Sequence, residues 1–125
     1  MGYEGKKALV VDEPKVMRQI IINFLKELGF SDPSEAENGA AGLKKVGEEP
    51  VDLIVSCWNM SNMTGLDFLK AVRADAKLKG TAFIMVTSES DKEKIMEAVQ
   101  AGVDQYIVKP FNAMQLEEKI NAIKF

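Results

Sequence analysis

The chain has 125 residues, of which 46% are hydrophobic, and its formal net charge is −3. That length and hydrophobic content suit one domain with its own core, so we expect a single domain over residues 1–125. The chain has no basic block, no apolar stretch near 18 residues and no apolar segment at its start. We therefore expect no direct binding to nucleic acid, no membrane span and no signal peptide.

Strand-like and helix-like patterns alternate five times along the chain. In chain order, we expect strands at residues 7–12, 33–36, 51–57, 82–87 and 105–109. A helix follows each strand, at residues 14–28, 40–46, 66–74, about 91–101 and from 112 onward. Pro14 suits the first turn of a helix, Gly29 suits a helix C-terminus, and Asn112 is a typical N-cap.

Apolar residues at helical spacing mark the buried faces expected of these helices. The first helix has its predicted inner face at Met17, Ile20, Ile21, Phe24, Leu25 and Leu28. The fifth has Leu116, Ile120 and Ile123 inward. The fourth carries Ile95, Met96 and Val99, and the sequence does not assign them to its inner face. The strand runs at 53–55 and 83–86 are unbroken rather than alternating, which is typical of strands buried on both faces. Together these patterns predict a parallel α/β sheet covered by helices on both sides.

Polar residues stand where four of the predicted strands end. Asp12, followed by Glu13, ends the first strand, and Cys57, Thr87 and Lys109 end the third, fourth and fifth. Open α/β sheets bind ligands at the carboxyl ends of their strands, so we expect these side chains to meet there. The acid pair alone would indicate a plain helix N-cap more readily than a metal site, because acids there favour the helix dipole. The hydroxyl and the lysine at the matching ends favour a site for phosphate and metal.

Five separated segments make the chain resemble the response-regulator receiver domain, of the CheY-like type used in chemotaxis. They are residues 10–13, 57–60 with 63–66, 86–87, 101–102 and 106–111. The resemblance covers essentially the whole chain. It implies a flavodoxin-like, doubly wound α/β fold: five parallel strands in the order 2-1-3-4-5, with five helices.

The resemblance also implies roles for the site residues. Asp12 and Glu13 resemble the acid pair that holds Mg²⁺, and the backbone carbonyl of Asn59 would add a further ligand. Thr87 resembles the hydroxyl that binds a phosphoryl oxygen. Lys109 resembles the lysine that pairs with a phosphoryl oxygen, and its bond to the following proline resembles the family's cis-proline turn.

An output face is implied by the same resemblance. Tyr106 resembles the aromatic switch that turns inward when the threonine moves, and it would lie beside Ile95, Val99 and Lys119 on a face that contacts a protein target. Val99 could equally be a core residue. The single tryptophan, Trp58, follows the site cysteine and is expected at the rim of the site.

Cys57 is the main departure from the family pattern, because the family's phosphate acceptor at this place is an aspartate. Ser61 stands where a proline is usual, and Thr64 stands where an aspartate is common. Mg²⁺ prefers oxygen ligands, whereas thiolate sulfur suits zinc or copper(I). We therefore expect Mg²⁺ to bind weakly or not at all. A natural and an introduced cysteine are both compatible with the sequence.

Several interpretations of Cys57 stay open. It could be a small, buried apolar residue at a strand end. It could be a redox- or electrophile-sensing thiol, which would have to pair with another molecule because the chain has no second cysteine. It could itself accept a phosphoryl group as a thiolate, which Lys109 would favour and the acid pair would oppose.

These observations predict a two-component or phosphorelay receiver domain that acts by protein contact in chemotaxis-type signalling and is not phosphorylated on aspartate. Its expected partners are an upstream sensor histidine kinase and a protein target, with the chain a monomer or weak dimer. A cysteine-based thiol switch on the same scaffold is the alternative. The chain lacks histidine, a glycine-rich phosphate loop and a dinucleotide fingerprint, so we expect no enzyme. A single cysteine suits the cytoplasm.

Overall fold

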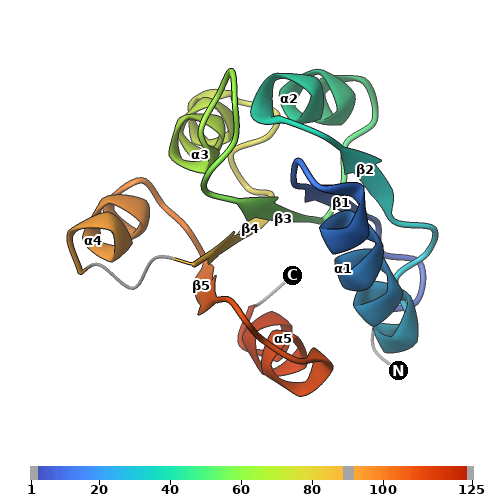
Figure 1. Cartoon of the computed structure of the whole chain (residues 1–125). Helices are drawn as coiled ribbons and strands as arrows, with labels where there is room; N and C mark the ends of the chain where they lie inside the picture. Colours follow the sequence, from blue (N-terminus) through green and yellow to red (C-terminus); the bar gives the residue numbers. More distant parts are fainter. Residues whose placement is uncertain (1–2, 89–91, 124–125) are drawn as a thin grey trace.

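A computed structural model of the chain describes residues 3–88 and 92–123, and it contains one five-stranded parallel sheet (Figure 1). The strands are β1 (Ala8–Val11), β2 (Ser34–Ala36), β3 (Leu53–Cys57), β4 (Ala82–Thr87) and β5 (Gln105–Val108). Their order is β2-β1-β3-β4-β5, and every neighbouring pair is parallel. The doubly wound 2-1-3-4-5 fold predicted from the sequence is confirmed.

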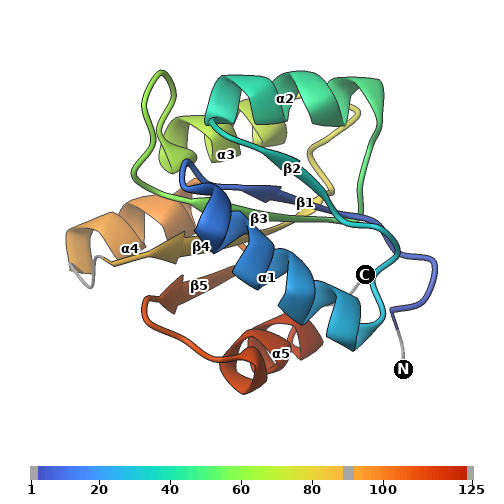
Figure 2. The same cartoon turned by 45° about the vertical axis from the view of Figure 1, so that its right-hand side comes forward.

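Within the residues that the structure describes, five helices cover the sheet, and each follows a strand in the chain. They are α1 (Lys15–Leu28), α2 (Gly39–Glu48), α3 (Gly65–Ala74), α4 (Lys92–Gln100) and α5 (Ala113–Asn121). α1 and α5 lie on one face, whereas α2, α3 and α4 lie on the other (Figure 2). Among the described residues, no helix combines the length and apolar character needed to cross a bilayer.

Each face of the sheet has its own apolar core. On one face, side chains of β1 and β3 pack with Ile21 and Leu25 of α1 and with Leu116 and Ile120 of α5. On the other face, Phe68 of α3 meets Phe83 of β4 edge to face, with ring centroids 5.5 Å apart. Because both faces are covered, β1, β3 and β4 are buried throughout, as their unbroken hydrophobic runs predict.

The sequence prediction differs from the structure at several helix positions. Ile20 was expected on the inner face of α1 but is 41% exposed, whereas Ile22 is buried. α1 is therefore turned about its axis toward Ile22, a rotation that its own apolar pattern does not determine. In α4, whose inner side the sequence leaves open, Ala98 is buried, and Met96 and Val99 are 56% and 57% exposed. The predicted start of that helix near residue 91 lies outside the described residues.

Two strands end one residue earlier than predicted. β1 ends at Val11 and β5 ends at Val108, so Asp12 and Lys109 each lie one residue beyond a strand. The predicted N-cap of α5 is confirmed, because the Asn112 side chain accepts from the Gln115 N–H and the Gln115 side chain accepts from the Asn112 N–H.

Candidate functional site

The carboxyl edge of the sheet brings together an acid, a thiol and a lysine. Lys109 Nζ lies 3.2 Å from Asp12 Oδ2 and 3.8 Å from Cys57 Sγ. These residues come from the ends of β5, β1 and β3, which are separated in sequence but meet through the topology of the sheet. The convergence of Asp12, Cys57 and Lys109 expected from the sequence is present in the structure.

Backbone hydrogen bonds continue past the strand ends and hold these residues in place. The Asp12 N–H donates to the Ala36 carbonyl oxygen at 3.2 Å, and the Lys109 N–H donates to the Thr87 carbonyl oxygen at 2.7 Å. The peptide bond between Lys109 and Pro110 is cis, as the sequence comparison suggested. The site therefore lies on an extension of the sheet rather than on a freely moving loop.

Burial shapes the chemistry of the acid and the thiol. Asp12 is 2% exposed and Cys57 is 7% exposed, so the ion pair with Lys109 compensates a carboxylate that has little contact with water. Burial raises the pKa of the Cys57 thiol, the Asp12 carboxylate raises it further, and Lys109 only partly opposes them. The thiol also donates to the Asn59 carbonyl oxygen, with sulfur and oxygen 3.6 Å apart. Cys57 is therefore a protonated thiol near neutral pH.

The Glu13 carboxylate is hydrogen-bonded to Ser61. Its Oε2 accepts hydrogen bonds from the Ser61 hydroxyl and from the Ser61 N–H, the latter at 3.2 Å. These bonds lower the pKa of Glu13. The carboxylate faces a hollow of about 370 Å³ lined by Glu13, Glu37, Asn38, Ser61 and Asn62.

Arg18 is a site residue that the sequence analysis missed. Its Nη1 donates to the carbonyl oxygens of Asp12 and Glu13, at 2.7 and 2.8 Å, while its Nε pairs with Glu35 at 2.6 Å. Arg18 thus fixes the backbone between β1 and α1. A polar residue in the first turn of α1, just after the acid pair, was the available signal.

Thr87 and Tyr106 occupy the places expected of them. Thr87 is 1% exposed at the end of β4, and Tyr106 is half-buried in the neighbouring β5. Tyr106 packs against the core cluster that contains Trp58 and Ala98. The same cluster contains Cys57, so Tyr106 and the site cysteine pack against one apolar core.

The expectation that Trp58 lies at the rim is wrong, and the exposure of Val99 decides between its two interpretations. Trp58 is 6% exposed and belongs to the core, because β3 continues into a segment that packs under α4; Lys94 Nζ lies 5.8 Å from its ring centroid. Val99 is 57% exposed, which excludes the alternative that it is a core residue. Ile95 and Lys119 are partly exposed.

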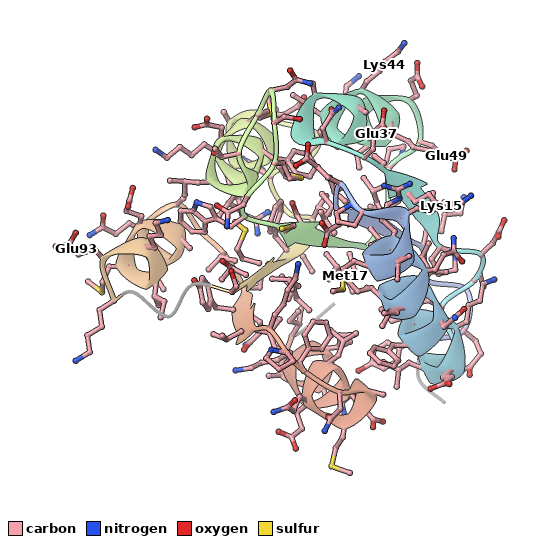
Figure 3. The ribbon with its side chains drawn as sticks, in the orientation of Figure 1. Lys15, Met17, Glu37, Lys44, Glu49 and Glu93 are labelled. Carbon is pink, nitrogen blue, oxygen red and sulfur yellow. The ribbon has the colours of Figure 1, made fainter. Side chains whose placement is uncertain are left out.

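A second hollow lies on the other side of the site. It measures about 250 Å³ and is lined by Met17, Ile20, Lys109, Pro110 and Phe111. Met17 extends from α1 toward the segment that joins β5 to α5 (Figure 3). The exposure of Ile20 is explained by its place on the wall of this hollow.

Comparison with known proteins places the chain in a family. The family model of the response regulator receiver domain matches residues 8–121. The chain belongs to this family. As a receiver domain of two-component signalling, it is a signalling protein rather than a classical enzyme.

The relatives of this receiver domain include named chemotaxis proteins. It is 48% identical over 117 residues to chemotaxis protein CheY of Pseudomonas aeruginosa, covering 94% of each chain. It is 45% identical over 120 residues to chemotaxis protein CheY-3 of Vibrio cholerae, covering 96% of this chain and 92% of the relative. The solved structure of Vibrio cholerae CheY4 superposes with a TM-score of 0.88 at 34% identity, over 95% and 98% of the two chains.

Receiver domains bind Mg²⁺, yet the side chains at this edge do not fit that ion well. Mg²⁺ requires several oxygen ligands in near-octahedral geometry. Here Asp12 is paired with Lys109, Glu13 is held by Ser61, and Cys57 offers sulfur. Within residues 3–88 and 92–123, no three His, Cys, Asp or Glu side chains are grouped so that they could hold a metal ion.

Proposed function

We propose that this chain is a CheY-like receiver of chemotaxis-type signalling in which Cys57 takes the place of the phosphate-accepting aspartate. The chemotaxis assignment is supported by relatives at 45–48% identity that carry that name. In this proposal, Asp12, Glu13 and the Asn59 carbonyl correspond to the metal ligands. Thr87 and Lys109 correspond to the groups that bind phosphoryl oxygens.

The contact between Lys109 Nζ and Cys57 Sγ is the observation that carries the proposal. It supports the view that the thiol stands where the family's lysine meets the acceptor carboxylate. A carboxylate at that place could attack phosphorus and form an acyl phosphate. A buried thiol whose pKa is raised is largely protonated near neutral pH and is a weak nucleophile there. In this proposal, position 57 forms no acyl phosphate, because it carries no carboxylate, and its thiol does not accept a phosphoryl group in its place.

The output of the chain is protein contact through α4, β5 and α5. Met96 and Val99 on α4 and Val108 on β5 are exposed apolar residues, with exposed fractions of 56%, 57% and 38%. Exposed apolar side chains next to an aromatic such as Tyr106 can form the centre of a binding surface. Ile95 and Lys119 belong to the same surface. A sensor histidine kinase is the upstream partner expected of the family.

Intact-mass analysis tests this function. The native chain and a Cys57→Asp variant are incubated with Mg²⁺ and acetyl phosphate, with Cys57→Ser as a matched control. In the variant, the carboxylate oxygen attacks phosphorus, the bond from phosphorus to the acetyl oxygen breaks, and acetate leaves. We expect one added phosphoryl group in Cys57→Asp and none in the native or Cys57→Ser chains. A phosphoryl group on the native chain would contradict the proposal.

The alternative of a thiol switch is less well supported. A reactive thiol is usually exposed and has a lowered pKa. Cys57 is 7% exposed and its pKa is raised by burial and by Asp12. No observation at the site favours thiol chemistry over the receiver function.

A further inference from the structure

The hydrogen bonds between Glu13 and Ser61 join two loops at the edge of the sheet. Glu13 lies between β1 and α1, and Ser61 lies between β3 and α3. Both the hydroxyl and the N–H of Ser61 donate to the same carboxylate oxygen, Oε2. We call this pair of bonds the Glu13–Ser61 clasp.

The clasp directs Glu13 away from the other site residues. The hollow that its carboxylate faces is lined by Glu37, Asn38, Ser61 and Asn62, and none of Asp12, Cys57 and Lys109 lines it. In the part of the chain that the structure describes, Glu13 does not combine with Asp12 and Cys57 into a group that could hold a metal ion. The acid is next to the site in sequence, but its carboxylate is bound elsewhere.

The Glu13 carboxylate could reach the other site residues by a movement of its side chain alone. Arg18 Nη1 fixes the Glu13 carbonyl oxygen at 2.8 Å and the Asp12 carbonyl oxygen at 2.7 Å, so the backbone here is anchored independently of Ser61. Glu13 is exposed, and its side chain therefore has room to adopt another rotamer. Loss of the Ser61 donors would free the carboxylate without removing the support of the loop.

We propose that Ser61 is a positioning residue that holds the Glu13 carboxylate out of the metal site. Any cation at the Asp12 edge competes with two hydrogen-bond donors for the same carboxylate. The chain then has two separate defects in Mg²⁺ binding. The thiol of Cys57 supplies no oxygen ligand, and the clasp keeps the Glu13 carboxylate oxygen bound to Ser61. This inference rests on the proposed receiver function and adds that restoring an acid at position 57 restores the metal site only in part.

The test is a calorimetric titration with Mg²⁺ in a series of variants that all carry Cys57→Asp. Ser61→Thr keeps a hydroxyl and an N–H, and we expect it to leave the Mg²⁺ dissociation constant unchanged. Ser61→Ala removes the hydroxyl, and we expect affinity to rise about fivefold, the size of one charge-assisted hydrogen bond at an exposed position. Ser61→Pro also removes the N–H and should raise the affinity further.

A double-mutant cycle identifies Glu13 as the group that is released. With Glu13→Ala and Cys57→Asp together, Ser61→Ala should have no effect on Mg²⁺ affinity. The proposal is overturned if Ser61→Ala leaves the affinity unchanged, lowers it, or raises it equally without Glu13, or if no variant binds Mg²⁺. Phosphoryl gain by Cys57→Asp is measured separately, so failure of the clasp and failure of the receiver function are distinguishable.

Discussion

Lys109 Nζ lies 3.2 Å from Asp12 Oδ2, and this ion pair joins the end of β5 to the end of β1 across the sheet. The Asp12 side chain is 3% exposed and the Lys109 side chain is 21% exposed. Cys57 offers this lysine sulfur rather than oxygen, so Asp12 is the one carboxylate within hydrogen-bonding distance of it among the described residues. The lysine therefore donates to Asp12, just beyond β1, as well as to the sulfur of Cys57.

Loss of this lysine should destabilise the fold. Lys109→Met keeps most of the apolar stem but leaves the buried Asp12 carboxylate without its cation. We expect the free energy of unfolding to fall by about 2 kcal/mol, since a buried charged acceptor that loses its partner bears its desolvation cost. Urea unfolding monitored by circular dichroism measures the change.

Lys70→Met is the matched control, because Lys70 is exposed on α3 and the same substitution there should change the free energy of unfolding by less than about 0.5 kcal/mol. In the Asp12→Asn background, Lys109→Met should cost less than it does alone. Equal losses for Lys109→Met and Lys70→Met would show that the ion pair contributes nothing.

Cys57 should react slowly with thiol reagents. Its pKa is raised by burial and by Asp12, so less thiolate is present at pH 8 than in an unstructured peptide. Reaction with a chromogenic disulfide should be slower than that of a peptide cysteine under the same conditions. Asp12→Asn should accelerate the reaction and Lys109→Met should slow it. The opposite order would contradict the electrostatic origin of the shift.

Stability should fall as the pH rises into the alkaline range. The native state keeps the Cys57 proton above the pH at which the unfolded chain, with an ordinary thiol pKa of about 8.5, releases it. The unfolded state then binds fewer protons, so the free energy of unfolding decreases with pH in that window. Cys57→Ser should show a flatter profile between about pH 8.5 and 10 in urea unfolding. Identical profiles for the two chains would rule out this contribution.

The fold was predictable because it depends on patterns that the sequence carries openly. Unbroken runs such as residues 83–86 mark strands buried on both faces, and their polar ends mark the site. Rotation about a helix axis is different, since one residue corresponds to about 100°. Whether Ile20 or Ile22 is buried in α1 depends on the neighbouring elements and not on the spacing within the helix.

Side-chain direction at the site was not predictable for a related reason. Asp12 and Lys109 could be brought together from strand ends alone, because the sheet aligns those ends. The contact of Glu13 with Ser61 and that of Arg18 with the β1–α1 backbone join loops, whose course no periodic pattern describes. Trp58 was expected at the rim for the same reason, although the segment after β3 turns beneath α4.

Substitution of the exposed valine of α4, Val99, tests whether its side chain contributes to the core. Val99→Ser should change the free energy of unfolding by less than about 0.5 kcal/mol, because the side chain is 57% exposed. Val72→Ser in α3 is the matched comparison; Val72 is 0% exposed, and the substitution should cost about 3 kcal/mol. Urea unfolding of both variants gives the comparison. A large decrease in the free energy of unfolding for Val99→Ser would show that Val99 is a core residue.

Gly65 should tolerate no larger residue, because α3 begins directly against the end of β3. A Cβ at this position would lie 2.2 Å from the Cys57 carbonyl oxygen and 2.9 Å from Trp58 Cα, both backbone atoms that cannot move independently of the strand. We expect Gly65→Ala to lower the free energy of unfolding by about 3 kcal/mol through this overlap. Thermal and urea unfolding measure the loss.

Gly47→Ala, the same substitution in α2, is expected to raise stability rather than lower it. Gly47 lies in α2, and an added Cβ there has no atom within 4 Å. Alanine has the higher helix propensity, so this variant should be more stable by about 0.5–1 kcal/mol. A Gly65→Ala chain as stable as the native one would contradict the close approach of α3 to Cys57. That approach holds the loop carrying Asn59 and Ser61 next to the site, so its loss should also disturb the contact of Cys57 Sγ with the Asn59 carbonyl.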